Sequence, residues 1–494
     1  MPKTIFGTTE KSNFILNMKT ERYWKYNLWI LLGFLVLMPV LSIPLEFVRV
    51  YSLPVIALAV TGVAAIVFTF IGFMKSVTPK KLWVFAGLFI AMVVWGYVSL
   101  MQSFYTGDPY NFNVATFGAD GRGEGLLAVL FYACFFMLGA QLGTDDNRLK
   151  LLHGMFWMGL AECAWGLLQA LPIGFPSWYQ NLEPLVLFRT FLPSGLTGSP
   201  IFLATLLAML TFPAVLACAF TDNSKRRTFY LICAVSFTLM AVKTQTLIGL
   251  AGTGLALLAA IVYILCKKQG KRGLLAVGAG LLGMCIGFGW SFGAAAVNGT
   301  TRGIDGEPVS GWTLYDGGVM WEDSSYRLET SGYYSAAEGA NPNGEFDLAN
   351  LRETYGYLWN VTGGIIKDYP LTGTGPDSLV YPQLFNSLTL GANPNTFDRA
   401  YDFYLQTAAT LGVPMLLLVC AVLILTIYHG IRAVRTGWIK AAVLGTVILY
   451  CIIMVIGSSA VTVAPLFWML AGVCSNMNGE PPLGAEPARA GASQ

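Results

Sequence analysis

The chain has few charged residues and almost no histidine. Of its 494 residues, 12% are Asp, Glu, Lys or Arg and only two are His, whereas an average soluble domain is about 25% charged. The net charge of +3 comes without a basic block, which argues against a nucleic-acid-binding protein. At 55% hydrophobic residues, the chain is also too apolar to be disordered. Long apolar runs bury their backbone polar groups as helices, so the composition indicates a polytopic helical membrane protein.

The cysteines form no recognisable pattern. All nine lie in or beside apolar runs, and none lies in the polar stretch 297–400. This distribution excludes a disulfide framework and offers no pair with metal-ligand spacing. We therefore interpret the cysteines as small packing residues, and we expect neither a metal nor a cofactor.

The hydropathy pattern predicts twelve membrane spans joined by mostly short loops. The first nine fall within 27–296 and the last three within 403–476. The seventh and eighth spans are nearly continuous, which requires a tight reversal between Lys243 and Thr246. The predicted spans are 27–47, 53–74, 82–102, 124–143, 150–172, 200–220, 228–246, 247–266, 273–296, 403–428, 438–458 and 461–476.

The distribution of Lys and Arg predicts the orientation of these spans. With the N-terminus inside, 21 of the 30 basic residues lie on the cytoplasmic side, as the positive-inside rule requires. We therefore expect a multi-pass membrane protein with a cytoplasmic N-terminal segment (1–26) and a cytoplasmic tail (477–494). No cleavable signal peptide is apparent, because the first apolar run is long enough to span the membrane.

One long outward segment, 297–402, interrupts the pattern. Its first half, to residue 349, is rich in Gly, Ser, Asp, Glu, Trp and Tyr and is interpreted as an irregular or hairpin-bearing insertion. A helix is predicted over 351–367, followed by a Gly-rich turn at 371–378. Long loops of this kind are often functional.

Three basic residues lie in short loops on the outward side, against the orientation rule: Arg122, Arg189 and Lys243. Each has a simple explanation in interfacial snorkelling or a local ion pair. The alternative is an anion site at the outer membrane surface, since the planar guanidinium of Arg suits phosphate oxygens. Both histidines fall at predicted cytoplasmic helix ends, so proton transfer on the outer face must use Asp, Glu, Tyr or Lys.

A single carboxylate, Glu162, lies in the middle of the fifth predicted span. An ionisable side chain at that depth is a functional candidate. The alternative is a neutral carboxyl group that is hydrogen-bonded within the bundle.

Four groups of residues, taken in chain order, carry a family resemblance. They are Asp-Gly-Arg-Gly-Glu-Gly-Leu-Leu at 120–127, Trp-Gly-Leu-Leu-Gln at 165–169, Gly-Leu-Thr-Gly-Ser-Pro at 195–200 with Phe-Leu-Ala at 202–204, and an outer-loop group. The outer-loop group comprises Leu-Trp at 358–359, Asp-Tyr-Pro-Leu-Thr-Gly-Thr-Gly-Pro-Asp at 368–377, Asp-Arg-Ala-Tyr-Asp-Phe-Tyr-Leu-Gln at 398–406 and Gly412. Together they resemble the bacterial O-antigen ligase/polymerase family, whose members act on glycans carried by polyprenyl diphosphate.

The chain departs from the family pattern at several polar positions. The family His corresponds to Tyr401, and the Asn that follows it corresponds to Asp402. A Ser-Arg pair of the family corresponds to Lys243 and Thr244. The Arg that the family often has before the Trp helix falls near Tyr355 in this chain. Arg352 lies one helical turn earlier on the same face.

The resemblance implies a fold, a reaction and partners. The fold class is an all-α polytopic membrane protein of about twelve transmembrane helices with one large extracytoplasmic loop, similar to the glycosyltransferase-C fold. The implied activity is a metal-independent glycosyltransferase that transfers or polymerises oligosaccharide units for cell-surface polysaccharide. Its partners are a polyprenyl-diphosphate-linked oligosaccharide, an acceptor glycan and the lipid bilayer, with no nucleic acid.

The resemblance also suggests site residues. A departing lipid diphosphate gains negative charge, which cationic groups must meet; the substrate-binding candidates are Arg122, Glu124, Arg189, Lys243, Arg352 and Arg399. Asp402 is the candidate base, and Tyr401 is a candidate for orienting the acceptor. Asp402 is equally suited to cap the helix that follows it, and the two roles are compatible. Glu124 could likewise pair with Arg122 or stabilise a helix start.

Two other functions remain open at this point. A transporter or flippase for a lipid-linked glycan would show paired repeats or broken helices in two halves, and the chain has no clear repeat. A catalytically inactive glycan-assembly subunit is compatible with Tyr401 at the position of the family His. The sequence does not distinguish a polymerase from a ligase.

Overall fold

The computed structural model describes most of the predicted spans and parts of the loops between them. The first part of α12, the end of α11 and both strands are described by their backbone alone. The described residues are 20–43, 53–74, 78–102, 115–118, 123–171, 193–244, 246–297, 310–315, 318–323, 348–379, 399–434 and 437–478.

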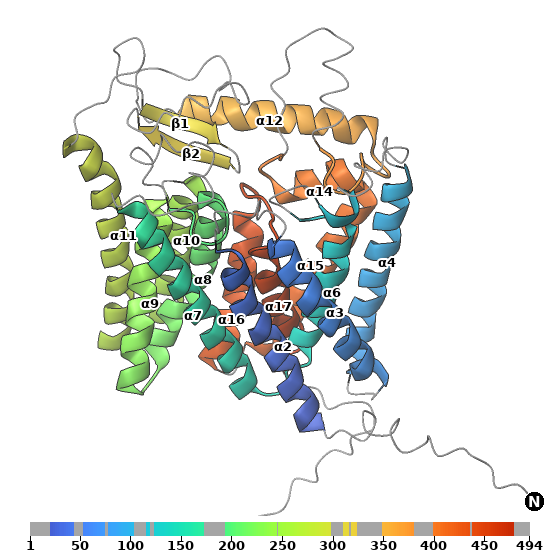
Figure 1. Ribbon diagram of the computed structural model, residues 1–494. Helices are drawn as coiled ribbons and strands as arrows, with labels where there is room; N and C mark the ends of the chain where they lie inside the picture. Colours follow the sequence, from blue (N-terminus) through green and yellow to red (C-terminus); the bar gives the residue numbers. More distant parts are fainter. Residues whose placement is uncertain are drawn as a thin grey trace, which may run out of the picture.

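A bundle of helices forms the body of the molecule (Figure 1). Each predicted span overlaps a described helix, and the tenth overlaps two. Among the described helices, eight are long and apolar enough to cross a membrane: α2, α3, α4, α7, α8, α10, α11 and α15. The bounds are α2 Thr20–Leu41, α3 Leu53–Met74, α4 Lys80–Gln102, α6 Leu126–Ala140, α7 Asp145–Ala170, α8 Pro200–Phe220, α9 Ser224–Lys243, α10 Leu247–Cys266, α11 Lys271–Val297, α15 Val413–Ala433, α16 Trp438–Ile453 and α17 Ala464–Ser475.

The tenth predicted span is wrong as a single helix over 403–428. The structure has a short helix α14, Phe403–Leu411, and then α15, which begins at Val413. Gly412 separates them with φ +84°, and a Cβ at this position would overlap the carbonyl of Leu371. An apolar pattern runs through both helices, so hydropathy alone does not reveal the break.

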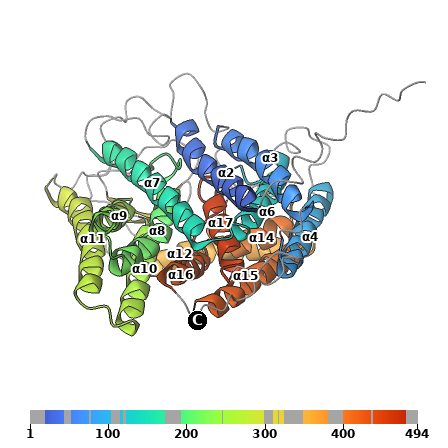
Figure 2. The ribbon, with the colours of Figure 1, turned by 90° about the horizontal axis from the view of Figure 1, so that it is seen from below.

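Helix α8 lies at the centre of one half of the bundle. It packs against α7, α9, α10, α11 and α16, and all its residues from Pro200 to Ala219 are buried. A helix that is apolar on every side belongs in such a position. Seen from below, α7 to α11 form one side of the bundle, and α2, α3, α4, α6 and α15 form the other, with α16 and α17 between them (Figure 2).

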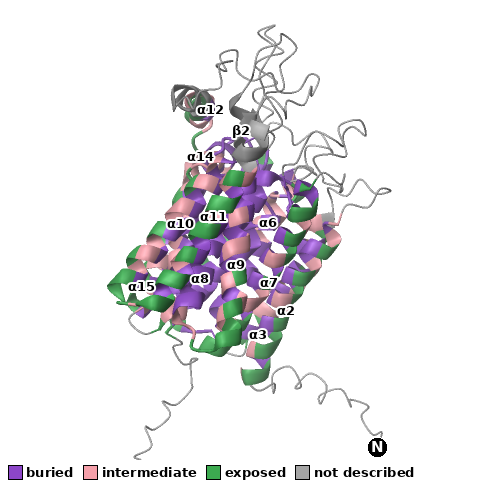
Figure 3. Cartoon of the chain, turned by 90° about the vertical axis from the view of Figure 1, so that its left-hand side faces the viewer, coloured by how far each residue is buried: buried purple, intermediate pink, exposed green. Residues whose placement is uncertain are grey.

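Exposed residues lie along the outer helices of the bundle (Figure 3), and many of them are large and apolar. On α3 these include Val60, Val63, Val67, Phe70 and Met74, which recur every three or four residues and so form one stripe. A stripe of this kind suits contact with lipid chains. The burial pattern therefore supports the assignment of a membrane protein.

Helix α12, Leu348–Asp368, lies across one end of the bundle above α14 (Figure 1). Its buried positions Leu358, Thr362 and Ile365 are three or four residues apart, whereas Trp359 and Lys367 are exposed. Leu358 and Ile365 share a small apolar core with Tyr401. Beside α12, strands β1 (Ser310–Tyr315) and β2 (Gly318–Asp323) form an antiparallel pair in the segment for which a hairpin-bearing insertion is predicted.

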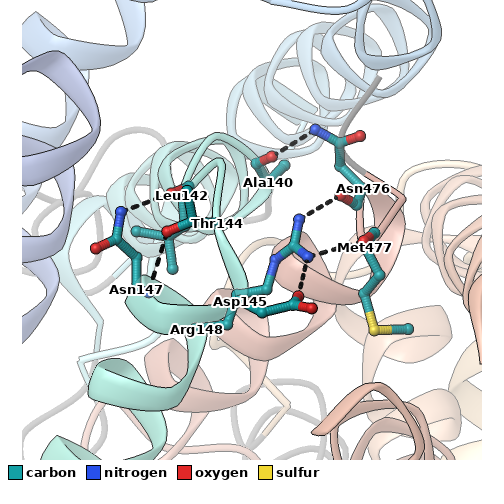
Figure 4. A network of polar contacts seen from close by, with 8 residues as sticks. All are labelled: Ala140, Leu142, Thr144, Asp145, Asn147, Arg148, Asn476 and Met477. Atoms are coloured by element: carbon teal, nitrogen blue, oxygen red, sulfur yellow. Dashed lines mark hydrogen bonds and ion pairs between the residues drawn. The ribbon is translucent and has the colours of Figure 1, made fainter. Parts of the chain in front are cut away.

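At the opposite end, Arg148 joins three helices (Figure 4). Its guanidinium donates to the carbonyls of Asn476 and Met477, both at 2.8 Å, and to Asp145 at 2.6 Å. Asn476 donates in turn to the carbonyl of Ala140. Because the last carbonyls of a helix lack partners within it, this network completes the end of α17 and fixes it against α6 and α7.

Candidate functional site

A cavity opens among α4, α6, α14, α15 and α17 near the α12 end of the bundle. Its volume is about 90 Å³, which suits a few water molecules or one small polar group, so most of a glycan must lie outside it. Its lining combines apolar side chains with carboxylates and hydroxyl groups. The lining residues are Phe89, Met92, Glu124, Ala128, Val129, Tyr132, Asp377, Phe403, Gln406, Thr407, Thr410, Leu411, Met415, Val419, Ser458, Ser459 and Trp468.

Glu124 lies in the cavity wall two residues before α6 begins. The hydroxyl groups of Ser459 and Tyr132 donate to its Oε1 at 2.5 and 3.1 Å. Burial raises the pKa of Glu124 to about 7, and the negative charge of Asp377 acts in the same direction. The two hydroxyl groups and the positive charge of Arg399 lower the pKa and offset part of this rise. The side chain is therefore held by α6 and by the α16–α17 connection, and it does not cap α6, whose N-cap is Gly125.

The second carboxylate of the cavity, Asp377, comes from the Gly-rich turn predicted at 371–378. This turn is fixed to the end of α14, because the backbone N–H groups of Thr374 and Gly375 donate to Ala409 and Thr410 at 3.0 and 2.8 Å. Asp377 itself has φ +54° and is 8% exposed. A left-handed backbone is unusual for a residue other than Gly and is common at functional sites.

Arg399 connects two of the sequence motifs. Its guanidinium carbon lies 4.7 Å from the centre of the Phe202 ring on α8, and its positive charge acts on Glu124. The side chain is 6% exposed. Arg399 is thus a buried cation near the carboxylates of the cavity.

Asp402 takes the capping role that the sequence suggests. Its Oδ1 accepts from the backbone N–H groups of Tyr404 and Leu405 at 2.8 and 3.0 Å, which makes it the N-cap of α14. Burial raises the pKa of Asp402, and these two hydrogen bonds lower it in part. Asp402 does not line the cavity described above.

Tyr401, the other residue predicted to be catalytic, lies in the small apolar core under α12. It is 2% exposed and has φ +49°. Its neighbours in this core include Leu358, Leu379 and Ala409. Tyr401 is likewise not part of the cavity lining.

Lys243 is the last residue of α9, at the predicted reversal. Thr244 and Thr246 shape this reversal, because Thr246 accepts from the N–H of Gly249 at the start of α10. The Lys243 side chain is 1% exposed, and its Nζ lies 5.2 Å from the centre of the Trp290 ring. Within the described part of the chain, no carboxylate forms an ion pair with it.

Glu162, the carboxylate in the fifth predicted span, has a hydrogen-bond partner in the turn before α8. Glu162 accepts from the N–H of Leu196 at 2.6 Å, and Gln169 accepts from the N–H groups of Ser194 and Gly195 at 3.0 and 2.9 Å. Both acceptors come from α7 and hold the turn that leads into α8. Two motifs that are 30 residues apart in the sequence, at 165–169 and 195–200, are therefore in direct contact.

The structure brings together only part of the predicted set. Glu124 lines the cavity, whereas Arg399 and Lys243 both lie outside its lining. The positive charge of Arg399 nevertheless acts on Glu124. Arg122 and Arg189 fall outside the described residues, and of Arg352 only the backbone in α12 is described. The described residues contain no group of three His, Cys, Asp or Glu that could hold a metal ion.

Several residues of the cavity were not singled out from the sequence. Ser459 lies in a Gly-Ser-Ser interruption between the last two predicted spans, and Tyr132 lies eight residues after Glu124 in an aromatic-rich helix. A polar interruption in an apolar stretch is a usable signal for Ser459. Nothing in the local sequence pairs Tyr132 with Glu124.

One stretch of the chain resembles a known protein family. No curated protein matches the chain. The family described as O-antigen ligase matches residues 231–420, a stretch that contains Lys243, the Gly-rich turn with Asp377, Arg399 and Asp402. Residues 231–420 are thus similar to the O-antigen ligase family, and they lie within a polytopic membrane protein.

Proposed function

We propose that this protein is a glycosyltransferase of the O-antigen ligase/polymerase type, which moves oligosaccharide units from a polyprenyl-diphosphate carrier at the outer face of the bacterial plasma membrane. The main support for the proposal is that residues matched by the family line a cavity that also contains carboxylates. The turn 371–379 and the segment 399–406, both within the matched residues, meet Glu124 at one cavity.

The orientation in this proposal follows from charge. Basic residues cluster at the end of the bundle opposite α12, at the starts of α4, α9 and α11 and at the end of α15. The positive-inside rule assigns that end to the cytoplasm. The cavity and α12 then face the exterior, and both termini are cytoplasmic.

The reaction requires positive charge where the lipid diphosphate leaves and negative charge where the acceptor hydroxyl group attacks. A hydroxyl group of the acceptor attacks the anomeric carbon, the bond from that carbon to the diphosphate oxygen breaks, and the lipid diphosphate leaves with the electron pair. Cations that stabilise this leaving group are the buried Arg399 and Lys243, together with the sequence candidates Arg122, Arg189 and Arg352. In this proposal these side chains, rather than a metal ion, stabilise the leaving diphosphate.

The carboxylates suit the other substrate. Glu124 and Asp377 would repel a diphosphate, and they favour hydroxyl groups and the positive charge that develops at the anomeric carbon. We therefore assign the attacking hydroxyl group of the acceptor to the cavity. The diphosphate is assigned to the cations named above, of which Arg399 and Lys243 lie outside the cavity lining.

Turnover by the purified full-length protein in nanodiscs tests the proposal. With a polyprenyl-diphosphate-linked oligosaccharide from the source organism, a ladder of longer lipid-linked glycans identifies a polymerase, and transfer to a different acceptor identifies a ligase. Arg399→Met should lower kcat/KM at least tenfold. The matched change Arg272→Met, at an exposed ion pair with Asp222 at the opposite end, should leave turnover unchanged.

The proposal fails if the donor stays intact under all acceptor conditions. Movement of the intact donor across the bilayer would identify a transporter instead. Binding of the glycan without turnover would identify an assembly subunit.

A further inference from the structure

We infer that Glu124 is a catalytic residue: its carboxylate accepts the proton of the attacking acceptor hydroxyl. This inference rests on the proposed function and assigns the proton acceptor of that same site. It differs from the sequence-based expectation, which gave the proton to Asp402.

Among the described residues, the hydrogen bonds of Glu124 use only one of its two carboxylate oxygens. Ser459 and Tyr132 both donate to Oε1, and among the described residues no hydrogen bond reaches Oε2. The side chain lines the cavity and is only partly buried. A carboxylate that is fixed through one oxygen and open through the other has the geometry of a general base.

Asp402 is placed differently. Its Oδ1 binds two backbone N–H groups of α14, so its orientation is set by the helix start. It also lies outside the cavity lining. Replacing this cap would disturb α14 and the cavity residues Gln406, Thr407 and Thr410, which gives Asp402 an indirect influence on the reaction.

The surroundings of Glu124 support the assignment. Burial raises its pKa to about 7, where a base is half ionised near neutral pH. The titratable and charged groups that act on it are Tyr132 on α6, Tyr450 on α16, Asp377 in the Gly-rich turn and Arg399 before α14. Asp377 raises the pKa of Glu124 and Arg399 lowers it, so burial remains the main cause of the raised pKa.

The proton-transfer step is balanced. The acceptor oxygen forms a bond to the anomeric carbon while its proton moves to Oε2 of Glu124. The bond between the anomeric carbon and the diphosphate oxygen breaks, and the electron pair leaves with the lipid diphosphate. Glu124 then releases the proton to water at the mouth of the cavity.

The experiment measures kcat and KM against pH for the full-length protein in nanodiscs, with the native polyprenyl-diphosphate oligosaccharide as donor. The wild type should lose kcat/KM as the pH falls through about 7. Glu124→Gln should lower kcat at least 100-fold, with the donor KM within about threefold of the wild type. Asp222→Asn, the same chemical change at an exposed site, should leave both constants unchanged.

A second variant keeps the inference testable if Glu124→Gln fails to fold. Ser459→Ala removes a hydrogen bond that favours the charged carboxylate, so the acid limb of the profile should move to higher pH. A residue with a purely structural role would lower the amount of active protein without moving this limb.

The outcomes separate the two proposals. Wild-type turnover that persists in Glu124→Gln, or an acid limb that Ser459→Ala does not move, overturns the assignment of Glu124 and leaves the proposed function intact. Absence of turnover in the wild type overturns both.

Discussion

The Nζ of Lys243 lies 5.2 Å from the centre of the Trp290 ring, on a side chain that is only 1% exposed. Burying an ammonium group is costly unless it is paired, and contact with an aromatic face offsets only part of that cost. Among the described residues no carboxylate pairs with Lys243. We propose that a phosphate group of the lipid-linked donor pairs with Lys243 when the donor binds.

Replacing this cation tests that role. Lys243→Met keeps an unbranched side chain that is one atom shorter and removes the charge. It should raise the donor KM by about 30-fold, which corresponds to roughly 2 kcal/mol for a charged hydrogen bond. Lys267→Met is the matched control, since Lys267 lies 5.8 Å from the Tyr263 ring but is exposed at the opposite end. An unchanged KM with a higher melting temperature would mean that Lys243 has no anionic partner.

The raised pKa of Glu124 predicts how stability depends on pH. The folded protein holds this proton more tightly than the unfolded chain, so the stabilisation is present below about pH 4.5 and is lost as the pH rises to about 7. Glu124→Gln stays neutral throughout. The melting temperature of the wild type minus that of Glu124→Gln should therefore fall across this interval, by the equivalent of at most roughly 3 kcal/mol. A constant difference would contradict the pKa assignment.

The junction between α14 and α15 depends on Gly412. Its positive φ disfavours any side chain, and a Cβ there would overlap the carbonyl of Leu371 in the Gly-rich turn. Gly412→Ala should lower the free energy of unfolding by about 3 kcal/mol or more and reduce activity, as measured by thermal unfolding and turnover. Gly437→Ala has a similar φ but open space around it, so its loss should be about 1 kcal/mol. Equal losses would show that the contact with the turn is unimportant.

The hydrogen bond from Leu196 to Glu162 holds the turn before α8. Glu162→Leu leaves the N–H of Leu196 without its acceptor, which should cost about 1–3 kcal/mol of stability. Glu162→Gln retains an acceptor oxygen, so its loss of stability should be less than half of that of Glu162→Leu. Thermal unfolding of both variants in the same detergent checks the order. If both variants lose the same stability, charge rather than hydrogen bonding matters at this position.

Much of the fold follows from the sequence because hydropathy reports burial in lipid directly. The predicted spans overlap helices, eight of which are long and apolar enough to cross a membrane. The reversal at Lys243 to Thr246 is present, and two Thr side chains close it. Hydropathy fails where backbone conformation decides, as at Gly412, where an apolar run continues through a break in the helix.

The site follows from the sequence only in part. Motif residues such as Glu124 and Arg399 can be selected by residue type and by resemblance. Their partners depend on tertiary contacts over long separations, such as Ser459 with Glu124 across 335 positions. Asp402 shows the same limitation in another way, since capping and catalysis favour the same residue type before a helix.

Glycosyl transfer is tested most directly by measuring polyprenyl diphosphate release and new glycosidic bonds in the same reaction of the wild-type protein in nanodiscs. We expect one polyprenyl diphosphate to be released for each oligosaccharide unit transferred. Glycan that changes sides of the bilayer while still attached to its carrier, with no diphosphate released, would contradict it.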